Sequence, residues 1–182
     1  MANRLTILTR EHPTLRQTAQ RVTDIHDRRL QLFIDDLLLT LKESNGVGIA
    51  ASQVDQPYQV MIVASRPNPR YPKAPSMEPT VMINPVIVAR SLEQESGWEG
   101  CLSVPGLRGW VPRHCAITVD YCDRQGVLQR LEMEGFIARI FQHEYDHFQG
   151  ILFCDRVERE MDLISEEEYQ AMLEKEKQLS AG

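Results

Sequence analysis

The chain has 182 residues, of which 42% are hydrophobic and 25% are charged, which is typical of one globular domain with a sizeable core. We therefore expect a single catalytic or binding domain over residues 1–182. The net charge of -6 argues against direct nucleic-acid binding, because such proteins gather Lys and Arg on one face. No apolar run resembles a signal peptide or approaches the roughly 20 residues of a membrane helix, so we expect a cytoplasmic chain without membrane contact.

The four cysteines predict free thiols rather than disulfides. None of them forms a CxxC pair, and reduced thiols are the default in a chain without a secretory signal. Isolated cysteines are usually small buried apolar residues, and we assign Cys115, Cys122 and Cys154 to packing. Cys101 is different, because it lies in the segment 98–105, which is considered below as a source of a metal ligand.

The first half of the chain begins with an amphipathic helix and continues into strands. Apolar residues recur at three- and four-residue spacings over residues 28–43, and Asn45-Gly46 ends this helix. Short β-rich runs follow at 59–64, 81–89, 116–121 and 127–133, and the turn at 123–126 predicts a hairpin between the last two. The segment 66–80 holds five of the ten prolines and is interpreted as a surface loop.

Two further helices complete the expected fold. One covers residues 135–148, has apolar residues recurring on one face, and is followed by Gly150, which suits the left-handed terminating position. The other covers about 165–178, and Ser165 and Glu168 have the spacing of a capping box. Short antiparallel strands packed around a central helix predict an α+β fold.

The most informative motif is HExxH, which lies on the 135–148 helix. Residues four apart share a helix face, so His143 and His147 can converge on one metal ion, and Glu144 can reach a metal-bound water without being a ligand. A surface helix that carries two histidines by chance is the alternative. A catalytic site of this kind needs one further protein ligand, because the fourth position stays open.

Three kinds of third ligand are conceivable. The metzincin pattern requires a His where this chain has Phe153, which excludes it. Gluzincins use a downstream Glu, and Glu166, Glu167 and Glu168 lie in that neighbourhood, although acidic residues in a first helical turn commonly face solvent. The remaining candidate is Cys101, because a thiolate beside a glycine on an extended segment can approach a helix closely.

Three separate segments resemble the signatures of the peptide deformylase family. Residues 46–53, GVGIAASQ, are similar to the first signature, EGCLS at 99–103 to the second, and QHEYDH at 142–147 to the third. The segments occur in family order over about residues 5–165. GVGIAA also fits the dinucleotide-binding GxGxxA pattern, but a helix rather than a strand precedes it, and we set that interpretation aside.

The resemblance implies the chemistry of the site. Cys101, His143 and His147 would bind one divalent metal ion, with Fe(II) as the native ion and Zn(II), Ni(II) or Co(II) able to substitute. Glu144 would act as general base and then protonate the leaving amine. Gln53 and the backbone N–H of Leu102 would stabilise the oxyanion. The reaction would remove the formyl group from formyl-methionyl peptides and release formate.

The resemblance also implies how a peptide is held. Backbone at Val47 and Gly48 would pair with an extended substrate. Val47, Phe136 and Ile140 would line the methionine pocket, with core packing as an equal alternative for Phe136 and Ile140. Glu99 and Gln142 are candidates to orient the metal ligands, Arg113 is a possible partner of Glu99, and Arg139 is expected at the pocket edge. The ribosome is a possible partner near the nascent-chain exit.

Two rival hypotheses belong to other classes. A zinc peptidase with a Glu ligand is motivated by HExxH and the acidic cluster at 166–168. A non-catalytic peptide-binding or structural-metal protein is the other, but the intact Gln53, Cys101 and Glu144 argue against it.

Overall fold

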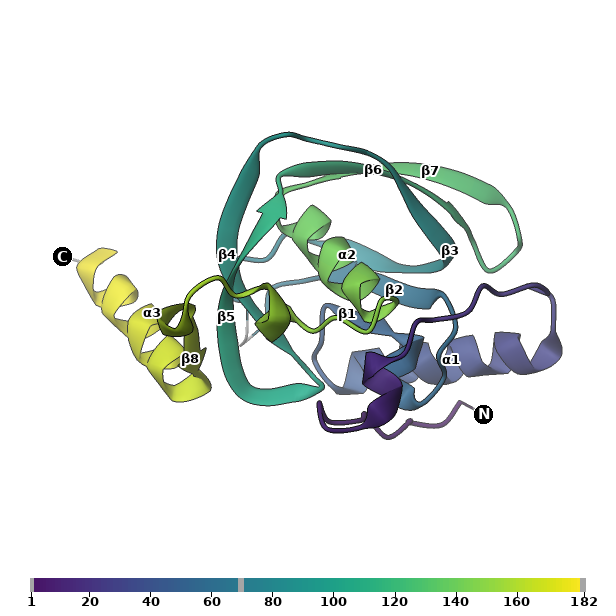
Figure 1. Cartoon of the computed structure of the whole chain (residues 1–182), viewed down its shortest axis with the longest axis horizontal. Helices are drawn as coiled ribbons and strands as arrows, with labels where there is room; N and C mark the ends of the chain where they lie inside the picture. The colour runs from purple at the N-terminus through teal and green to yellow at the C-terminus, as the bar shows by residue number, and fades with distance from the viewer. Residues whose placement is uncertain (1, 69–70, 181–182) are drawn as a thin grey trace.

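The computed structural model describes residues 2–68 and 71–180 and has an α+β architecture with two antiparallel sheets (Figure 1). The larger sheet has the order β1-β2-β3-β6-β7, with strands Gly48–Ala50, Val60–Ser65, Met77–Arg90, Ala116–Cys122 and Leu128–Glu134. The smaller has the order β4-β5-β8, with strands Gln94–Cys101, Val104–His114 and Leu163–Ser165. The helices are α1 (Arg28–Glu43), α2 (Gly135–His147) and α3 (Glu166–Ser180), and short 3-10 helices occur at Pro13–Arg16, Ala51–Val54, Phe153–Arg156 and Glu160–Asp162.

Helix α1 confirms the sequence prediction at both ends. Its N-cap is Asp27, whose carboxylate accepts hydrogen bonds from the first turn. It ends before Asn45, which takes a left-handed conformation with φ 53°. The apolar face of α1, including Ile34 and Leu37, packs on β1 and β2 and forms one of the hydrophobic clusters of the molecule.

Helix α2 runs through the centre of the molecule, with strands of both sheets around it (Figure 1). Its apolar side, with Ala138 and Phe141 fully buried, belongs to the cluster that includes Met61 and Met82 of the larger sheet. Gly150 has φ 68° as expected, and no other residue type adopts this conformation as readily. Its other side is unusual, because five polar side chains of the helix are buried: Gln142, His143, Glu144, Asp146 and His147. The centre of the fold therefore presents polar groups that need partners.

Two parts of the fold differ from the sequence prediction. The predicted hairpin is confirmed as β6 and β7, but β4 and β5 were expected only as extended chain around Cys101, because their glycines and prolines lower strand propensity. Cross-strand pairs, such as Trp98 opposite Trp110, hold this hairpin together. The segment 66–80 is also not simply a surface loop, since β3 begins at Met77 and Ala74 is buried.

Within residues 2–68 and 71–180, the helices are all too short or too polar to cross a membrane.

Candidate metal centre

Three side chains from two elements meet beside a cavity. Cys101 ends β4, whereas His143 and His147 lie one turn apart on α2, and one donor atom from each falls within 4.8 Å of the others. The Cys101 Sγ lies 3.5 Å from His147 Nε2. All three side chains are buried. The structure thus brings together the three residues that the sequence nominated as ligands.

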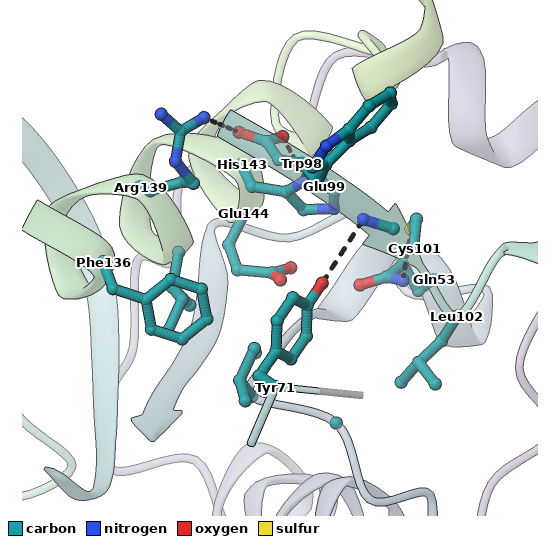
Figure 2. A pocket seen from close by; sticks show the side chains of 15 residues that line it. Gln53, Tyr71, Trp98, Glu99, Cys101, Leu102, Phe136, Arg139, His143 and Glu144 are labelled. Atoms are coloured by element: carbon teal, nitrogen blue, oxygen red, sulfur yellow. Dashed lines mark hydrogen bonds and ion pairs between the residues drawn. The ribbon is translucent and has the colours of Figure 1, made fainter. Parts of the chain in front are cut away.

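Glu99 fixes the orientation of the first imidazole. Its Oε2 lies 2.9 Å from His143 Nδ1 (Figure 2), which leaves Nε2 as the ring nitrogen for a cation. Burial opposes ionisation of Glu99, but the charge and hydrogen bonds of Arg113 hold its pKa below the usual range. The predicted pairing of Arg113 with Glu99 is confirmed, and Arg113 also binds Asp146 at 2.6 Å.

The pKa values of the two imidazoles are shifted in opposite directions. Burial opposes charge on His143, but hydrogen bonds to Cys101 and Glu99 raise its pKa well above the usual value. Burial lowers the pKa of His147, so this ring is neutral, as an imidazole must be to bind a metal ion. Among the described residues, no group pairs with His147 Nδ1.

Glu144 points into the same space from α2 (Figure 2). It is 4% exposed, and no described residue donates a hydrogen bond to its Oε2. Burial raises its pKa to about 7, so this carboxyl group can take up or release a proton near neutral pH. Gly48 lies directly against it, since a Cβ at this glycine would be 2.5 Å from Glu144 Oε1.

Gln53 approaches the centre from the 3-10 helix that follows β1. Its Oε1 accepts a hydrogen bond of 2.9 Å from the Ala50 N–H, which fixes the amide. Its Nε2 then donates to Cys101 Sγ at 3.4 Å and to Ser103 Oγ at 3.1 Å. The amide N–H groups therefore lie beside the thiol, and Leu102, which follows Cys101, lines the same cavity.

The cavity is small, about 30 Å³, which is room for roughly one water-sized group beside the three donor atoms. Four residues nominated for substrate binding line it: Val47, Gly48, Phe136 and Ile140. Arg139 also lines it, as expected for the pocket edge. Sequence reasoning missed Tyr71, whose ring lies 5.1 Å from that of Phe136 and whose hydroxyl accepts a hydrogen bond from the Gly100 N–H at 3.3 Å. An aromatic residue inside the Pro-rich segment was the available signal.

One sequence interpretation of a nearby residue is wrong. The Gln142 side chain binds backbone rather than the three candidate ligands: it pairs with the N–H and C=O of His114, which ties α2 to β5, and donates to the Ala138 C=O. The geometry does not favour a glutamate third ligand, because among the described residues it is Cys101 that lies with the two imidazoles, whereas Glu166 binds Arg108 at 2.6 Å and Glu168 caps α3 through Ser165. The GxGxxA interpretation fails as well, since a 3-10 helix follows β1.

The fold and the site together define a class. One thiol and two imidazoles converge beside a cavity, and a buried carboxyl group with a near-neutral pKa lies next to them, as in a mononuclear metallohydrolase. A family model described as polypeptide deformylase matches residues 4–162, and the chain belongs to the peptide deformylase family. It is a metal-dependent hydrolase that removes the formyl group from the N-terminal formyl-methionine of nascent polypeptides and releases formate.

Similar proteins agree with this assignment. Peptide deformylase 2 of Nostoc sp. is 60% identical over 171 residues, which cover 94% of this chain and 96% of that protein. Peptide deformylase 2 of Shewanella oneidensis is 52% identical over 142 residues, 78% of each chain. The crystal structure of a class I type b peptide deformylase from Acinetobacter baumannii with Met-Ala-Ser bound has a TM-score of 0.84 at 45% identity, over 86% of this chain and 100% of that chain.

Proposed function

We propose that Cys101, His143 and His147 bind the divalent cation on which the deformylase activity depends. The observation that supports this most is the approach of their donor atoms to within 4.8 Å beside the cavity. The donor set also fits such an ion, because a thiolate and two imidazoles suit Fe(II) or Zn(II) and leave a coordination position for the reaction. The buried Glu144 Oε2 faces the same space without a partner among the described residues.

Glu144 is proposed as the proton carrier of the reaction. A cation bound there supplies Lewis acidity, which lowers the pKa of water to about 7. With a pKa of about 7, the Glu144 carboxylate accepts a proton from the attacking water and later gives it to the leaving amine. Its position against Gly48 fixes where that proton is held.

Gln53 and Leu102 are proposed to stabilise the oxyanion that forms at the formyl carbon. The Gln53 amide is anchored by Ala50 and carries two N–H groups beside Cys101, and the Leu102 N–H follows the ligand directly in the chain. Loss of one such donor typically costs about 2.7–4 kcal/mol of transition-state stabilisation. Gln53→Ala should therefore lower kcat by about 10²–10³-fold.

The substrate peptide is proposed to extend along β1. This strand lies at the edge of the larger sheet, which supports the pairing of an added strand with the backbone at Val47 and Gly48; the Val47 C=O itself accepts from the Ala64 N–H at 2.8 Å. Phe136 and Ile140 are proposed to receive the methionine side chain, since both line the cavity. The Acinetobacter baumannii relative is described with bound Met-Ala-Ser, a peptide that begins with methionine.

The identity of the ion, the partner and the cellular location are further proposals. We infer Fe(II) as the native ion, with Zn(II), Ni(II) or Co(II) as substitutes, and metal analysis of protein purified without oxygen tests this. We place the enzyme in the cytoplasm, near the ribosomal exit where its nascent substrates emerge, which co-sedimentation with ribosomes tests. Residues 1–182, with the C-terminal helix, are proposed to act as one catalytic domain.

The decisive experiment combines formate release with metal content on the same samples. Glu144→Ala should abolish formate release from a formyl-Met peptide while the metal stays bound. Cys101→Ala should lose both metal and activity, and Cys115→Ala, which changes a thiol outside the cluster, should lose neither. Full activity of the Glu144 variant, or normal metal content of the Cys101 variant, would remove the proposed mechanism.

A further inference from the structure

Arg139 lines the cavity, but its guanidinium is bound to the protein. It lies one turn before His143 on α2, and its side chain is 11% exposed. Its Nη atoms donate to four oxygens: Glu95 O at 2.6 Å, Val111 O at 2.7 Å, Glu99 Oε1 at 3.0 Å and Gly97 O at 3.4 Å. A charged group that is largely removed from water needs hydrogen-bond partners, and Arg139 has four. A residue that only lined the cavity would not need this many.

The contact with Glu99 completes a symmetric set of hydrogen bonds. Glu99 Oε1 accepts from Arg139 (Figure 2) and from Arg113 Nε at 2.9 Å. Its Oε2 accepts from His143 and from Arg113 Nη2 at 2.9 Å. An ionised carboxylate has about four acceptor positions, so every one is used. Without Arg139, Oε1 keeps one donor of two, and the rotation of the carboxylate that holds His143 is less restricted.

Gly97 makes this arrangement possible. A Cβ at residue 97 would lie 2.9 Å from Arg139 Cζ and 3.0 Å from Nε, so a larger residue would displace the guanidinium from the β4 backbone. A glycine inside a strand weakens that strand, and the close approach of Arg139 is a physical reason for the glycine at position 97 of β4.

The remaining bonds of Arg139 join the two elements that carry the proposed ligands. Val111 O belongs to β5 and Glu95 O to β4, the strand that ends at Cys101, whereas Arg139 belongs to the helix of His143. The spacing between thiol and imidazole depends on how α2 lies against this hairpin. Arg139 therefore acts on that spacing as well as on Glu99.

We propose that Arg139 is a positioning residue of the metal centre, which orients His143 through Glu99 and holds α2 against the β4–β5 hairpin. The proposal rests on the ligand set proposed above. We do not assign Arg139 as a cation for the substrate, since both of its Nη atoms donate to protein oxygens.

The test uses Co(II)-loaded protein and the substitution Arg139→Met, which keeps the apolar stem and removes the donors. Changes to groups that orient metal ligands typically cost about 10–100-fold in affinity or activity. Because Arg113 remains on Glu99, we expect Co(II) loss to a chelator to quicken by about 10-fold, with an altered Co(II) absorption spectrum and a lower kcat at nearly unchanged KM. Arg139→Lys should lie between this variant and the unchanged protein. Arg130→Met, which removes an exposed arginine paired with Asp120, should match the unchanged protein.

An unchanged rate of Co(II) loss in folded Arg139→Met protein would overturn the proposal, as would a raised KM with unchanged metal loss, which would make Arg139 a wall residue only. If that variant does not fold, Gly97→Ala and Arg139→Lys replace it, since the first displaces the guanidinium while keeping the arginine. His143→Ala distinguishes a wrong ligand set from a wrong role for Arg139. If it still binds one Co(II) tightly, the ligand set itself is wrong; if it does not, a normal Arg139→Met result refutes only the role of Arg139.

Discussion

The glycine at position 48 permits a sharp test of how the proton carrier is placed. In Gly48→Ala, the new Cβ would lie 2.5 Å from Glu144 Oε1 and 2.8 Å from its Cγ, whereas ordinary contacts begin at about 3.4 Å. The carboxylate must therefore withdraw by about 1 Å. A misplacement of about 1 Å can cost about 100-fold in rate, which corresponds to about 2.7 kcal/mol.

The assay is formate release from a formyl-Met peptide, measured on protein with normal metal content and unfolding temperature. A double-mutant cycle with Glu144→Asp adds a second readout, because the shorter side chain relieves the contact and the effect of Gly48→Ala should be smaller in that background. The reasoning is refuted if Gly48→Ala keeps kcat within about threefold of the unchanged enzyme. It is equally refuted if the two substitutions act additively.

Three further predictions concern stability. Gly150→Ala should destabilise the fold by more than about 2 kcal/mol in urea unfolding, since φ is 68° and the Cβ would lie 2.5 Å from the Arg16 carbonyl oxygen; a change under 0.5 kcal/mol would contradict this. Arg113→Met should cost about 3–5 kcal/mol by the same measurement, because two buried carboxylates lose their cation, and a neutral result would disprove that account. Burial opposes charge on Asp155, but the hydrogen bond from Arg16 lowers the pKa of this carboxyl group, so its ionised form stabilises the folded state above the unfolded pKa of about 3.9. The difference in Tm between the unchanged protein and Asp155→Asn should therefore persist at pH 6 and shrink below about pH 4. A difference that does not change with pH would refute this account.

Much of the fold was predictable because its signals are local. The spacing of apolar residues located α1 to its observed bounds, and the turn at 123–126 predicted the β6–β7 hairpin. The β4–β5 hairpin was not predictable in this way, because its strands contain Gly97, Gly106 and Pro112 and depend on pairing with each other. Strand pairing between such segments is a property of the assembled chain rather than of any short window.

The candidate site divides along the same line. Helical spacing alone placed His143 and His147 on one face, but spacing could not choose between a cysteine and a glutamate as third ligand. The family resemblance favoured Cys101, and the geometry agrees. Tyr71 was missed because its contacts arise only when the Pro-rich segment folds against α2. The role of Gln142 was misjudged because it binds backbone across the helix–strand boundary, which sequence does not reveal.

The division of the proposed ligands between two layers has a thermodynamic consequence. Cys101 belongs to the three-stranded sheet, and the two imidazoles belong to the helix that packs on the five-stranded sheet. A bound ion would therefore cross-link these two parts of the molecule. Such an ion stabilises the native state by RT ln(1 + [L]/Kd), or about 4.1 kcal/mol at a thousandfold excess over Kd. Stripping it should therefore loosen amide protons first along the seam where β4 meets α2, and hydrogen exchange would record that seam opening before the rest of the fold.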